Sequence, residues 1–526
     1  MKKLICLALL VFSFTMIACP SGGNNGVEFA IANGGEPQSL DPSQASGVPE
    51  RRIFTALFEG LTRIDPQTGG PRPGLAESWE YSTDRTVMTF TLRPNLTFSD
   101  GTPIDANAVV DSLRYYILPT TASTWASTYM NNIAGAAAVI AGQAAPETAG
   151  FRVVGPRTVE ITLTGPVPFM EERLAHTAFQ ILPMHIIRQY GDQWTRPENM
   201  VSSGAFNLVE WVPQNRIVAV PNPRYWDSEN VFIDRLSFLP IVDQNASLNA
   251  FRNGEVDWGV HGSFPPQLID ELRLRPDFHI NPSVLTEAYA FNASHAAVSD
   301  PRVRRAIAMA INRRELVDSV TRQGQTPARG WVPISMANYD HIPDEGFYNP
   351  EAARALLAEA GFPGGQGFPT IQVIYNTAET HRLNGEFIQA QLRDNLGITL
   401  NLQNMEWGSF LESRIFPTTI MFRMGWMGSD GDPMYFLQIF ETGDSNNNFN
   451  YSNPEFDALL QYARTLPDGP QRMAVLRQAE DIVVVQDQVI VPLHYGVNNN
   501  LIDLSKWAGW YINPYDLHPY VGIRPR

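Results

Sequence analysis

Residues that commonly perform catalysis or hold metal ions are scattered along this sequence. Its nine histidines include no pair at the i, i+3 or i+4 spacing that places two rings on one helix face. Asp430-Gly431-Asp432 has the acidic start of a calcium loop, but the later oxygen ligands and the closing glutamate are missing, so we interpret it as a turn. The Gly-x-Ser-x-Gly elbow, the phosphate-binding loop and the His-Glu-x-x-His zinc motif are also absent. We expect no resident metal, no cofactor and no enzymatic activity, and the missing motifs alone are weak evidence against an enzyme.

Two cysteines, Cys6 and Cys19, mark the N-terminal region. A basic start at Lys2 and Lys3 is followed by an apolar run over 4–18, the pattern of an export signal. Cys19 follows Ala18 as in the lipobox of bacterial lipoproteins. We predict a signal peptide over 1–18, lipidation of Cys19 and a flexible tether over 19–27. Ordinary secretion with an incidental cysteine is the alternative.

Composition and charge describe an acidic, globular protein. The chain has 526 residues, 44% of them hydrophobic, and a net charge of −16. That length favours two or three domains, and the negative charge argues against nucleic acid as a partner. Lysine occurs only at Lys2, Lys3 and Lys506, so an arginine at a given position carries little information by itself.

Hydrophobic periodicity and capping residues predict strands that alternate with helices. Strands are expected at 27–32, 87–93, 204–210, 216–220, 236–241, 371–375 and 398–402, with a two-strand unit at 153–163. Helices are expected at 53–61, 105–116, 245–253, 300–312, 350–360, 380–396, 453–465 and 470–486. We expect Asp300 to cap the fourth of these helices and the arginines of 302–305 to lie on its solvated face. The βαβ-like rhythm predicts an α/β fold.

Seven segments in fixed order resemble the solute-binding lipoproteins of peptide-importing ABC transporters (solute-binding protein family 5), within them most the oligopeptide-binding branch. The resemblance extends from Ala30 to about Tyr520. The segments are Pro37-Gln38-Ser39-Leu40-Asp41-Pro42, Leu57-Phe58-Glu59-Gly60-Leu61, Pro73-Gly74-Leu75-Ala76-Glu77-Ser78-Trp79, Ser99-Asp100-Gly101-Thr102-Pro103, Asn222-Pro223-Arg224-Tyr225-Trp226, Asp300-Pro301-Arg302-Val303-Arg304-Arg305-Ala306 and Glu406-Trp407-Gly408-Ser409-Phe410-Leu411. Each segment alone is a weak match, and their order over nearly the whole chain makes the resemblance specific.

The resemblance implies a two-lobed, hinged periplasmic-binding-protein fold of type II with an extra, family-specific domain. Lobe I is then discontinuous, over 28–58, 185–284 and 498–526, with the extra domain inserted at 59–184 and lobe II at 285–497. Ligand is expected at the lobe interface, where hinge motion buries it.

The resemblance also implies a set of ligand-binding residues. Trp407 and Trp426 match positions that form the walls of side-chain pockets, and Arg414, Arg423 and His381 match positions near the peptide carboxylate or backbone. A guanidinium suits a carboxylate because it donates two parallel hydrogen bonds. The remaining matches are Trp125 in place of a family tyrosine, Val48 and Gly425 at positions that offer backbone hydrogen bonds, and Met427 beside Trp426.

Two departures concern the ligand's ammonium group. Where the family has an aspartate and a glutamate that bind it, this chain has Ser429 and Ser46. A buried ammonium without a carboxylate costs about 2–5 kcal/mol relative to a paired one. Three explanations stay open: the neighbouring Asp430 takes the role, water solvates the terminus, or the ligand has no free ammonium.

These patterns together predict an extracytoplasmic, membrane-anchored lipoprotein of the periplasmic space. We expect a monomer that captures oligopeptides and delivers them to the permease subunits of an ABC importer. The alternatives are the same fold with a sugar, a metal chelate or a modified or N-blocked peptide as ligand, a secreted hydrolase, and a surface adhesin or chaperone.

Overall fold

The computed structural model describes residues 26–45, 47–67, 70–123, 125–167, 170–259, 264–336, 339–343, 348–428, 431–467, 469–513 and 515–526. Cys19, the predicted signal peptide, Ser46, Ser429 and Asp430 lie outside these ranges. Within the ranges, no helix is both long and apolar enough to cross a lipid bilayer.

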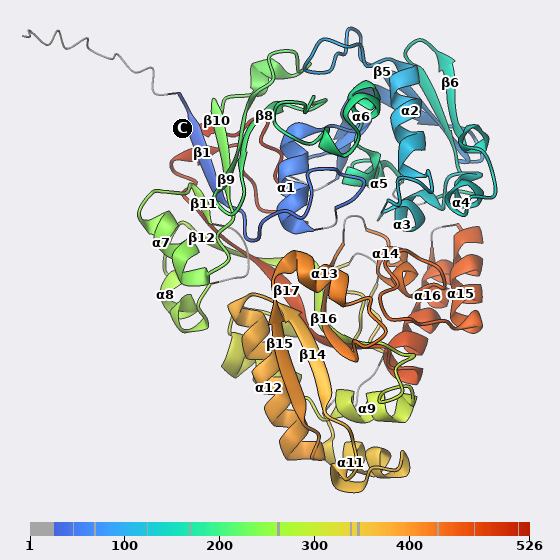
Figure 1. The fold of residues 1–526 in the computed structure, drawn as a ribbon, viewed down its shortest axis with the longest axis vertical. Coiled ribbons are helices and arrows are strands. Elements are labelled where there is room, and N and C mark those ends of the chain that lie inside the picture. The colour runs from blue at the N-terminus through green and yellow to red at the C-terminus, as the bar shows by residue number, and fades with distance from the viewer. Residues whose placement is uncertain are drawn as a thin grey trace, which may run out of the picture.

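One large mixed sheet runs through both halves of the molecule (Figure 1). Parallel pairing joins β1 to β10 and β11, and β14 to β15 and β16, whereas β12 and β17 pair antiparallel with their neighbours. In spatial order the strands are β15 (Leu400–Met405), β14 (Ile371–Asn376), β16 (Met421–Met427), β12 (Phe278–Phe291), β17 (Ile490–Ile502), β11 (Trp258–Gly259), β1 (Glu28–Ala32), β10 (Arg235–Leu239), β9 (Arg216–Pro221) and β8 (Phe206–Val212), with β13 (Thr326–Pro327) beside β17.

The long strands β12 and β17 belong to both halves. At one end Phe278 pairs with Leu501 beside β11, and at the other Ala290 pairs with Ile490 beside β16. The register shifts between Pro282 and Thr286, where the halves meet. Because these strands carry the chain between β8–β11 and β14–β16, we call the two halves lobe I and lobe II. Neither strand is among the expected elements, and the boundaries predicted at 285 and 497 remain predictions.

Lobe I carries a smaller unit, which we call the insert. The insert comprises the antiparallel sheet β4 (Ala76–Tyr81), β5 (Val87–Leu92), β7 (Thr158–Thr162) and β6 (Phe151–Gly155), the hairpin β2 (Thr62–Ile64) and β3 (Pro71–Pro73), and helices α2 (Ala106–Tyr116), α3 (Ala126–Met130), α4 (Ala136–Ile140) and α5 (Met170–Arg173). The rest of lobe I adds α1 (Val48–Leu57), α6 (Met184–Tyr190), α7 (Gln244–Arg252), α8 (Ile269–Leu272), β18 (Trp507–Ala508) and β19 (Arg524–Pro525).

Helices cover the strands of lobe II (Figure 1). They are α9 (Pro301–Met309), α10 (Arg313–Glu315), α11 (Pro350–Glu359), α12 (Glu379–Leu396), α13 (Trp407–Ser413), α14 (Met434–Leu437), α15 (Pro454–Thr465) and α16 (Pro470–Asp481). Ile307 of α9, Leu357 of α11 and Leu392 of α12 are buried in one apolar cluster with strands β14 and β16, which fixes these helices on the sheet.

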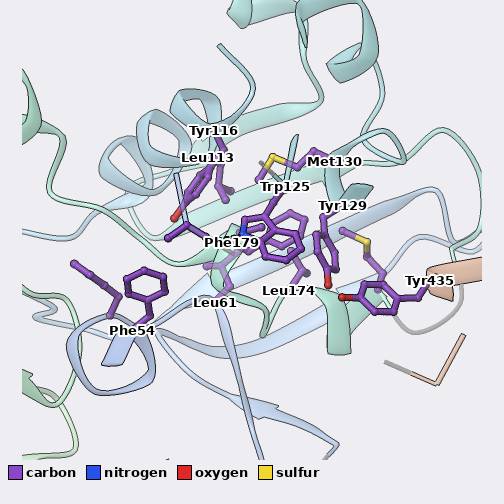
Figure 2. Packing of buried hydrophobic residues seen from close by; sticks show 14 of the residues in the cluster. Phe54, Leu61, Leu113, Tyr116, Trp125, Tyr129, Met130, Leu174, Phe179 and Tyr435 are labelled. Carbon is purple, nitrogen blue, oxygen red and sulfur yellow. Dashed lines mark hydrogen bonds between the residues drawn. The ribbon is translucent and has the colours of Figure 1, made fainter. Parts of the chain in front are cut away.

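A second apolar cluster joins the insert to α1 (Figure 2). Phe54 of α1 and Trp125 and Tyr129 of the insert belong to it. The Trp125 indole N–H donates to the Ala45 carbonyl (2.9 Å), and Gln180 donates to the carbonyls of Phe54 and Phe58 (both 3.2 Å). These contacts tie the insert to lobe I as one packed body.

The predicted cap at Asp300 and most of the predicted elements are confirmed, and Asp105 caps α2 in the same way. Asp105 accepts a hydrogen bond from the Ala108 amide (2.9 Å) and Asp300 from the Arg302 amide (2.8 Å). The helix predicted at 53–61 begins earlier, at Val48, because Pro49 suits the first turn, and ends at Leu57.

The prediction that the arginines of 302–305 lie on a solvated face is wrong for Arg304. Its side chain is buried, and its guanidinium donates to the carbonyls of Asp487 (2.7 Å), Val298 (2.7 Å) and Ser299 (2.9 Å). Three carbonyls therefore share one buried guanidinium as their donor, and this arginine is part of the packing of lobe II.

Glu480 of α16 is a buried carboxyl that organises the loop that follows β13. It accepts hydrogen bonds from the amides of Trp331 (2.6 Å) and Val332 (2.8 Å) and from the Tyr339 hydroxyl (2.7 Å). Burial raises the pKa of Glu480 from 4.5 to about 7, although the hydrogen bonds oppose the rise. Between pH 4.5 and about 7, the folded protein therefore keeps a proton on Glu480 that the unfolded chain has lost.

This linkage predicts a pH dependence of stability. Because the folded pKa lies above the unfolded one, the contribution of Glu480 is complete below pH 4.5 and is lost as pH rises through about 7. Glu480→Gln keeps the acceptor for both amides and removes the titration, so urea unfolding should show less loss of stability between pH 5 and 8, by about 2 kcal/mol. Glu359→Gln, at an exposed side chain of α11, should retain the wild-type slope. An unchanged slope in Glu480→Gln would contradict the assignment.

Candidate functional site

A cavity of about 480 Å³ lies between the two lobes. Residues from α1, β12, α12, α13, β16 and β17 line it, so both lobes contribute. The structure brings nine of the predicted site residues together in its wall: Val48, Trp125, His381, Trp407, Arg414, Arg423, Gly425, Trp426 and Met427. The roles assigned to them remain predictions.

Helix α13 places three of the lining side chains by simple periodicity. Trp407, Leu411 and Arg414 follow each other at i, i+4 and i+7, which is one face of a helix. Glu406 fixes the start of the helix by accepting from the amides of Gly408 (2.7 Å) and Ser409 (3.3 Å). The Arg414 guanidinium therefore projects into the cavity from the end of a capped helix.

Strand β16 places a buried ion pair on the cavity wall. Arg423, Gly425 and Met427 alternate toward the cavity, and Arg423 makes two bonds to Glu287 of β12, Nε to Oε1 (2.7 Å) and Nη2 to Oε2 (2.5 Å). A β-carbon at position 425 would collide with the Arg423 guanidinium and contact Glu287. A larger residue at position 425 would therefore displace the side chains of this ion pair.

Two histidines flank this ion pair. His381, in the first turn of α12, contacts the Asn376 carbonyl through Nδ1 (2.9 Å), and its Nε2 lies 3.9 Å from Glu287 Oε1. His494 of β17 is buried nearby, and desolvation, reinforced by Arg423, lowers its pKa to about 4. His494 is therefore neutral at physiological pH. Burial raises the pKa of Glu287, and the charge of Arg423 limits the rise.

Lobe I contributes Arg51, Val48 and, through the insert, Trp125. Val48 begins α1, and Arg51, one turn later, donates to the sulfur of Met427 in lobe II (3.2 Å). The ring of Trp125 packs edge-on against His176 at 4.8 Å between centroids. The cavity thus has aromatic walls on both sides, with Trp407 and Trp426 opposite.

The acidic side chains that line the cavity have partners, whereas two of its arginines have no carboxylate partner among the described residues. Each lining acid has partners: Glu287 binds Arg423, Asp516 binds Arg52 (2.9 Å), Glu406 caps α13, and Glu36 accepts from Trp211 (2.8 Å). Among the described residues, neither Arg51 nor Arg414 has a carboxylate partner. Burial lowers the pKa of both guanidinium groups, that of Arg414 to about 10 with help from Arg423, and both stay charged at neutral pH.

Sequence reasoning missed Glu287, Arg51 and His494. Glu287 is a single acid inside an apolar strand, Leu285-Thr286-Glu287-Ala288-Tyr289, and an isolated charge of that kind was an available signal for a functional or paired site. Arg51 and His494 had no such signal, because their positions in the cavity depend on the meeting of α1 and β17.

The arrangement is suited to binding an anionic, partly apolar molecule. Guanidinium groups without carboxylate partners attract an anion, and the tryptophan rings offer apolar contact. The described residues contain no group of three or more metal-ligating side chains.

Comparison with protein-family models matches residues 70–448 to the bacterial extracellular solute-binding proteins, family 5 (middle). Among curated proteins, the periplasmic oligopeptide-binding protein OppA of Salmonella typhimurium is 36% identical over 91% of this chain and 88% of its own length. A protein of Escherichia coli named as probable deoxycholate-binding, YgiS, is 30% identical over 98% of this chain and 96% of its own.

Solved structures share the fold. OppAIV of Borrelia burgdorferi superposes with a TM-score of 0.92 at 34% identity, covering 95% of this chain and all of that one. The murein tripeptide-binding protein MppA of Escherichia coli gives 0.90 at 31% identity, covering 95% and 98%. The unliganded open form of MppA gives only 0.64, at 30% identity over 95% and 97%. The two-lobed architecture is therefore shown, in an arrangement unlike that open form.

The ion pair and the unpaired arginine should differ in their effect on folding. Arg423→Met leaves Glu287 buried without its cation and should lower the free energy of unfolding by about 3 kcal/mol. Arg414→Met removes a desolvated charge that has no carboxylate partner and should leave stability unchanged or slightly higher. Urea unfolding of ligand-free protein checks both, and similar losses in the two variants would contradict the described pairing.

Proposed function

The chain belongs to the bacterial extracellular solute-binding proteins of family 5, and from that premise we propose that it captures oligopeptides outside the cytoplasm for an ABC importer. The observation that carries the proposal is the Arg414 guanidinium, held in the cavity wall without a carboxylate partner among the described residues. A peptide carboxylate supplies the missing anion through charge-assisted hydrogen bonds. The naming of several relatives as oligopeptide-binding points to the same ligand class.

Main-chain recognition is consistent with the edge of β16. β12 pairs with β16 along Met421–Met427, whereas β14 pairs only with Met421 and Phe422. In the described chain the outer edge of β16 beyond Phe422 therefore has no strand partner, and Gly425 lies there in the cavity wall. A peptide can add to such an edge as a strand, with bonds that do not depend on its side chains.

The group that binds the peptide ammonium remains a proposal. Ser46, Ser429 and Asp430 lie outside the described residues. We retain Asp430 as the carboxylate in this role, with a solvated terminus or an N-blocked ligand as alternatives. The name of YgiS points to a non-peptide ligand for that relative, so the peptide assignment needs a direct test.

Peptides that differ only at the C-terminus test the role of Arg414. Wild-type protein, stripped of ligand, should bind trialanine about tenfold or more tightly than its C-terminal amide, because the amide lacks the charge that Arg414 attracts. Arg414→Met should bind both peptides with similar, weaker affinity by isothermal calorimetry. Arg188→Met, at an exposed arginine of α6, serves as the control and should retain the preference.

Two outcomes would overturn the proposal. Wild-type protein that binds neither trialanine nor its amide would refute peptide capture. A preference for the acid that persists in Arg414→Met would assign the carboxylate to another cation.

Membrane attachment is proposed through Cys19, with the mature protein as a monomer that docks on permease subunits. Cys19→Ala should abolish incorporation of labelled palmitate and move the protein from the detergent phase to the aqueous phase in detergent partition. Partition into detergent by Cys19→Ala would contradict lipidation at this residue.

A further inference from the structure

The insert also contacts lobe II, through residues next to the cavity lining, although the insert is packed on lobe I. Arg173 of α5 lies 3.2 Å from the carboxylate of Asp432, which lies in lobe II just after β16. Asp432 also binds Arg472 of α16 through two bonds, at 2.9 Å and 2.7 Å. The side chains of Arg173, Asp432 and Arg472 are 1%, 1% and 3% exposed, so the charges meet where water is excluded.

A backbone contact accompanies the ion pair. The carboxylate of Glu172, the neighbour of Arg173, accepts from the amide of Gly431 (3.1 Å). Two consecutive residues of the insert thus bind two consecutive residues of lobe II. We call Glu172, Arg173, Gly431 and Asp432 the clasp.

A second polar patch joins α3 of the insert to lobe II. Ser127 donates to the Ser445 hydroxyl (2.8 Å), and Thr128 donates to the carboxylate of Asp444 (3.1 Å). Asn446 in turn donates to the Thr128 hydroxyl (2.6 Å). The insert therefore contacts lobe II at two separate places with matched donors and acceptors.

The clasp lies beside the wall of the cavity. Met427, which lines the cavity, ends β16 four residues before Gly431, and Tyr435, which also lines it, follows Asp432 in α14. Figure 2 shows Tyr435 facing Tyr129 of the insert, with 5.5 Å between ring centroids. Tyr435 also stacks on Trp426. Asp432 thus lies in the segment that joins β16 to α14, and both of these elements line the cavity.

From these contacts we propose that the clasp forms when the lobes close. It then joins the insert to lobe II, holds the cavity wall in place and slows ligand release. Arg173 is a positioning residue in this device. Arg472 keeps Asp432 paired within lobe II in either state, because both residues belong to that lobe. Arg173, in contrast, moves with lobe I, so hinge opening separates it from Asp432. The low TM-score of 0.64 against the unliganded open form of MppA agrees with a closed arrangement of the lobes here.

The ion pair between Arg173 and Asp432 is strong in the closed state because water is excluded from it. The pKa of Asp432 is lowered, since Arg472 and Arg173 outweigh the opposing effect of burial. Removing Arg173 leaves no unpaired acid, because the two bonds from Arg472 remain. The loss then includes the charge-assisted hydrogen bond between Arg173 and Asp432, which by itself corresponds to about a tenfold change in an equilibrium or rate.

The experiment compares Arg173→Met and Arg472→Met with trialanine as the probe, in otherwise unaltered protein. Dissociation is followed by stopped-flow tryptophan fluorescence, since three tryptophans line the cavity. Arg173→Met should release trialanine about tenfold faster, with the association rate and the ligand-free melting temperature close to wild type. Arg472→Met breaks a pair inside lobe II and should lower the melting temperature with and without peptide.

Two results would overturn the clasp. Wild-type dissociation in Arg173→Met would show that the contact does not retain ligand. A ligand-free melting temperature lowered as much in Arg173→Met as in Arg472→Met would show that the contact persists without closure and is only structural. Arg173→Lys, which restores the charge, should recover much of the slow release.

Discussion

The architecture depends on two strands shared by both lobes. β17 pairs with β11 of lobe I at one end, β12 pairs with β16 of lobe II at the other, and the two strands pair with each other in both lobes. Their backbone bonds hold the lobes in register, while the register shift near Pro282 leaves a place where the ladder can bend. A site built across this junction has half of its wall on each side. Arg51 and Trp125 come from one lobe, and Arg414 and Trp407 from the other, so the cavity is complete only when the lobes meet.

Charge placement follows from this geometry. Closing two lobes over a cavity removes water from every lining charge, and an unpaired buried charge is costly. The protein satisfies its acids internally, as with Glu287 beneath Arg423 and Asp516 beside Arg52, and leaves Arg51 and Arg414 without a carboxylate partner in the described residues. A ligand anion then relieves a cost that closure would otherwise impose. We propose that binding and closure are coupled by this shared desolvation.

Local signals in the sequence predicted much of the fold and part of the site. Asp105 and Asp300 cap the expected helices because capping depends on a few neighbouring residues, and Trp407 and Arg414 share a face because helical spacing is local. The strands β12 and β17 escaped prediction since Pro282, Pro492 and the run Asn498-Asn499-Asn500 mask their pattern, and pairing across the molecule overrides local propensity. Glu287, Arg51 and the partners of Arg173 and Arg304 depend on contacts between distant segments, which no periodicity records.

The central claim is that ligand binds between two lobes that close on it. Small-angle X-ray scattering of ligand-stripped protein, titrated with trialanine, measures this most directly. The account predicts a radius of gyration that falls as peptide is added, with a saturated profile that matches the closed structure described above. Peptide binding at full occupancy without any change in the radius of gyration would contradict it.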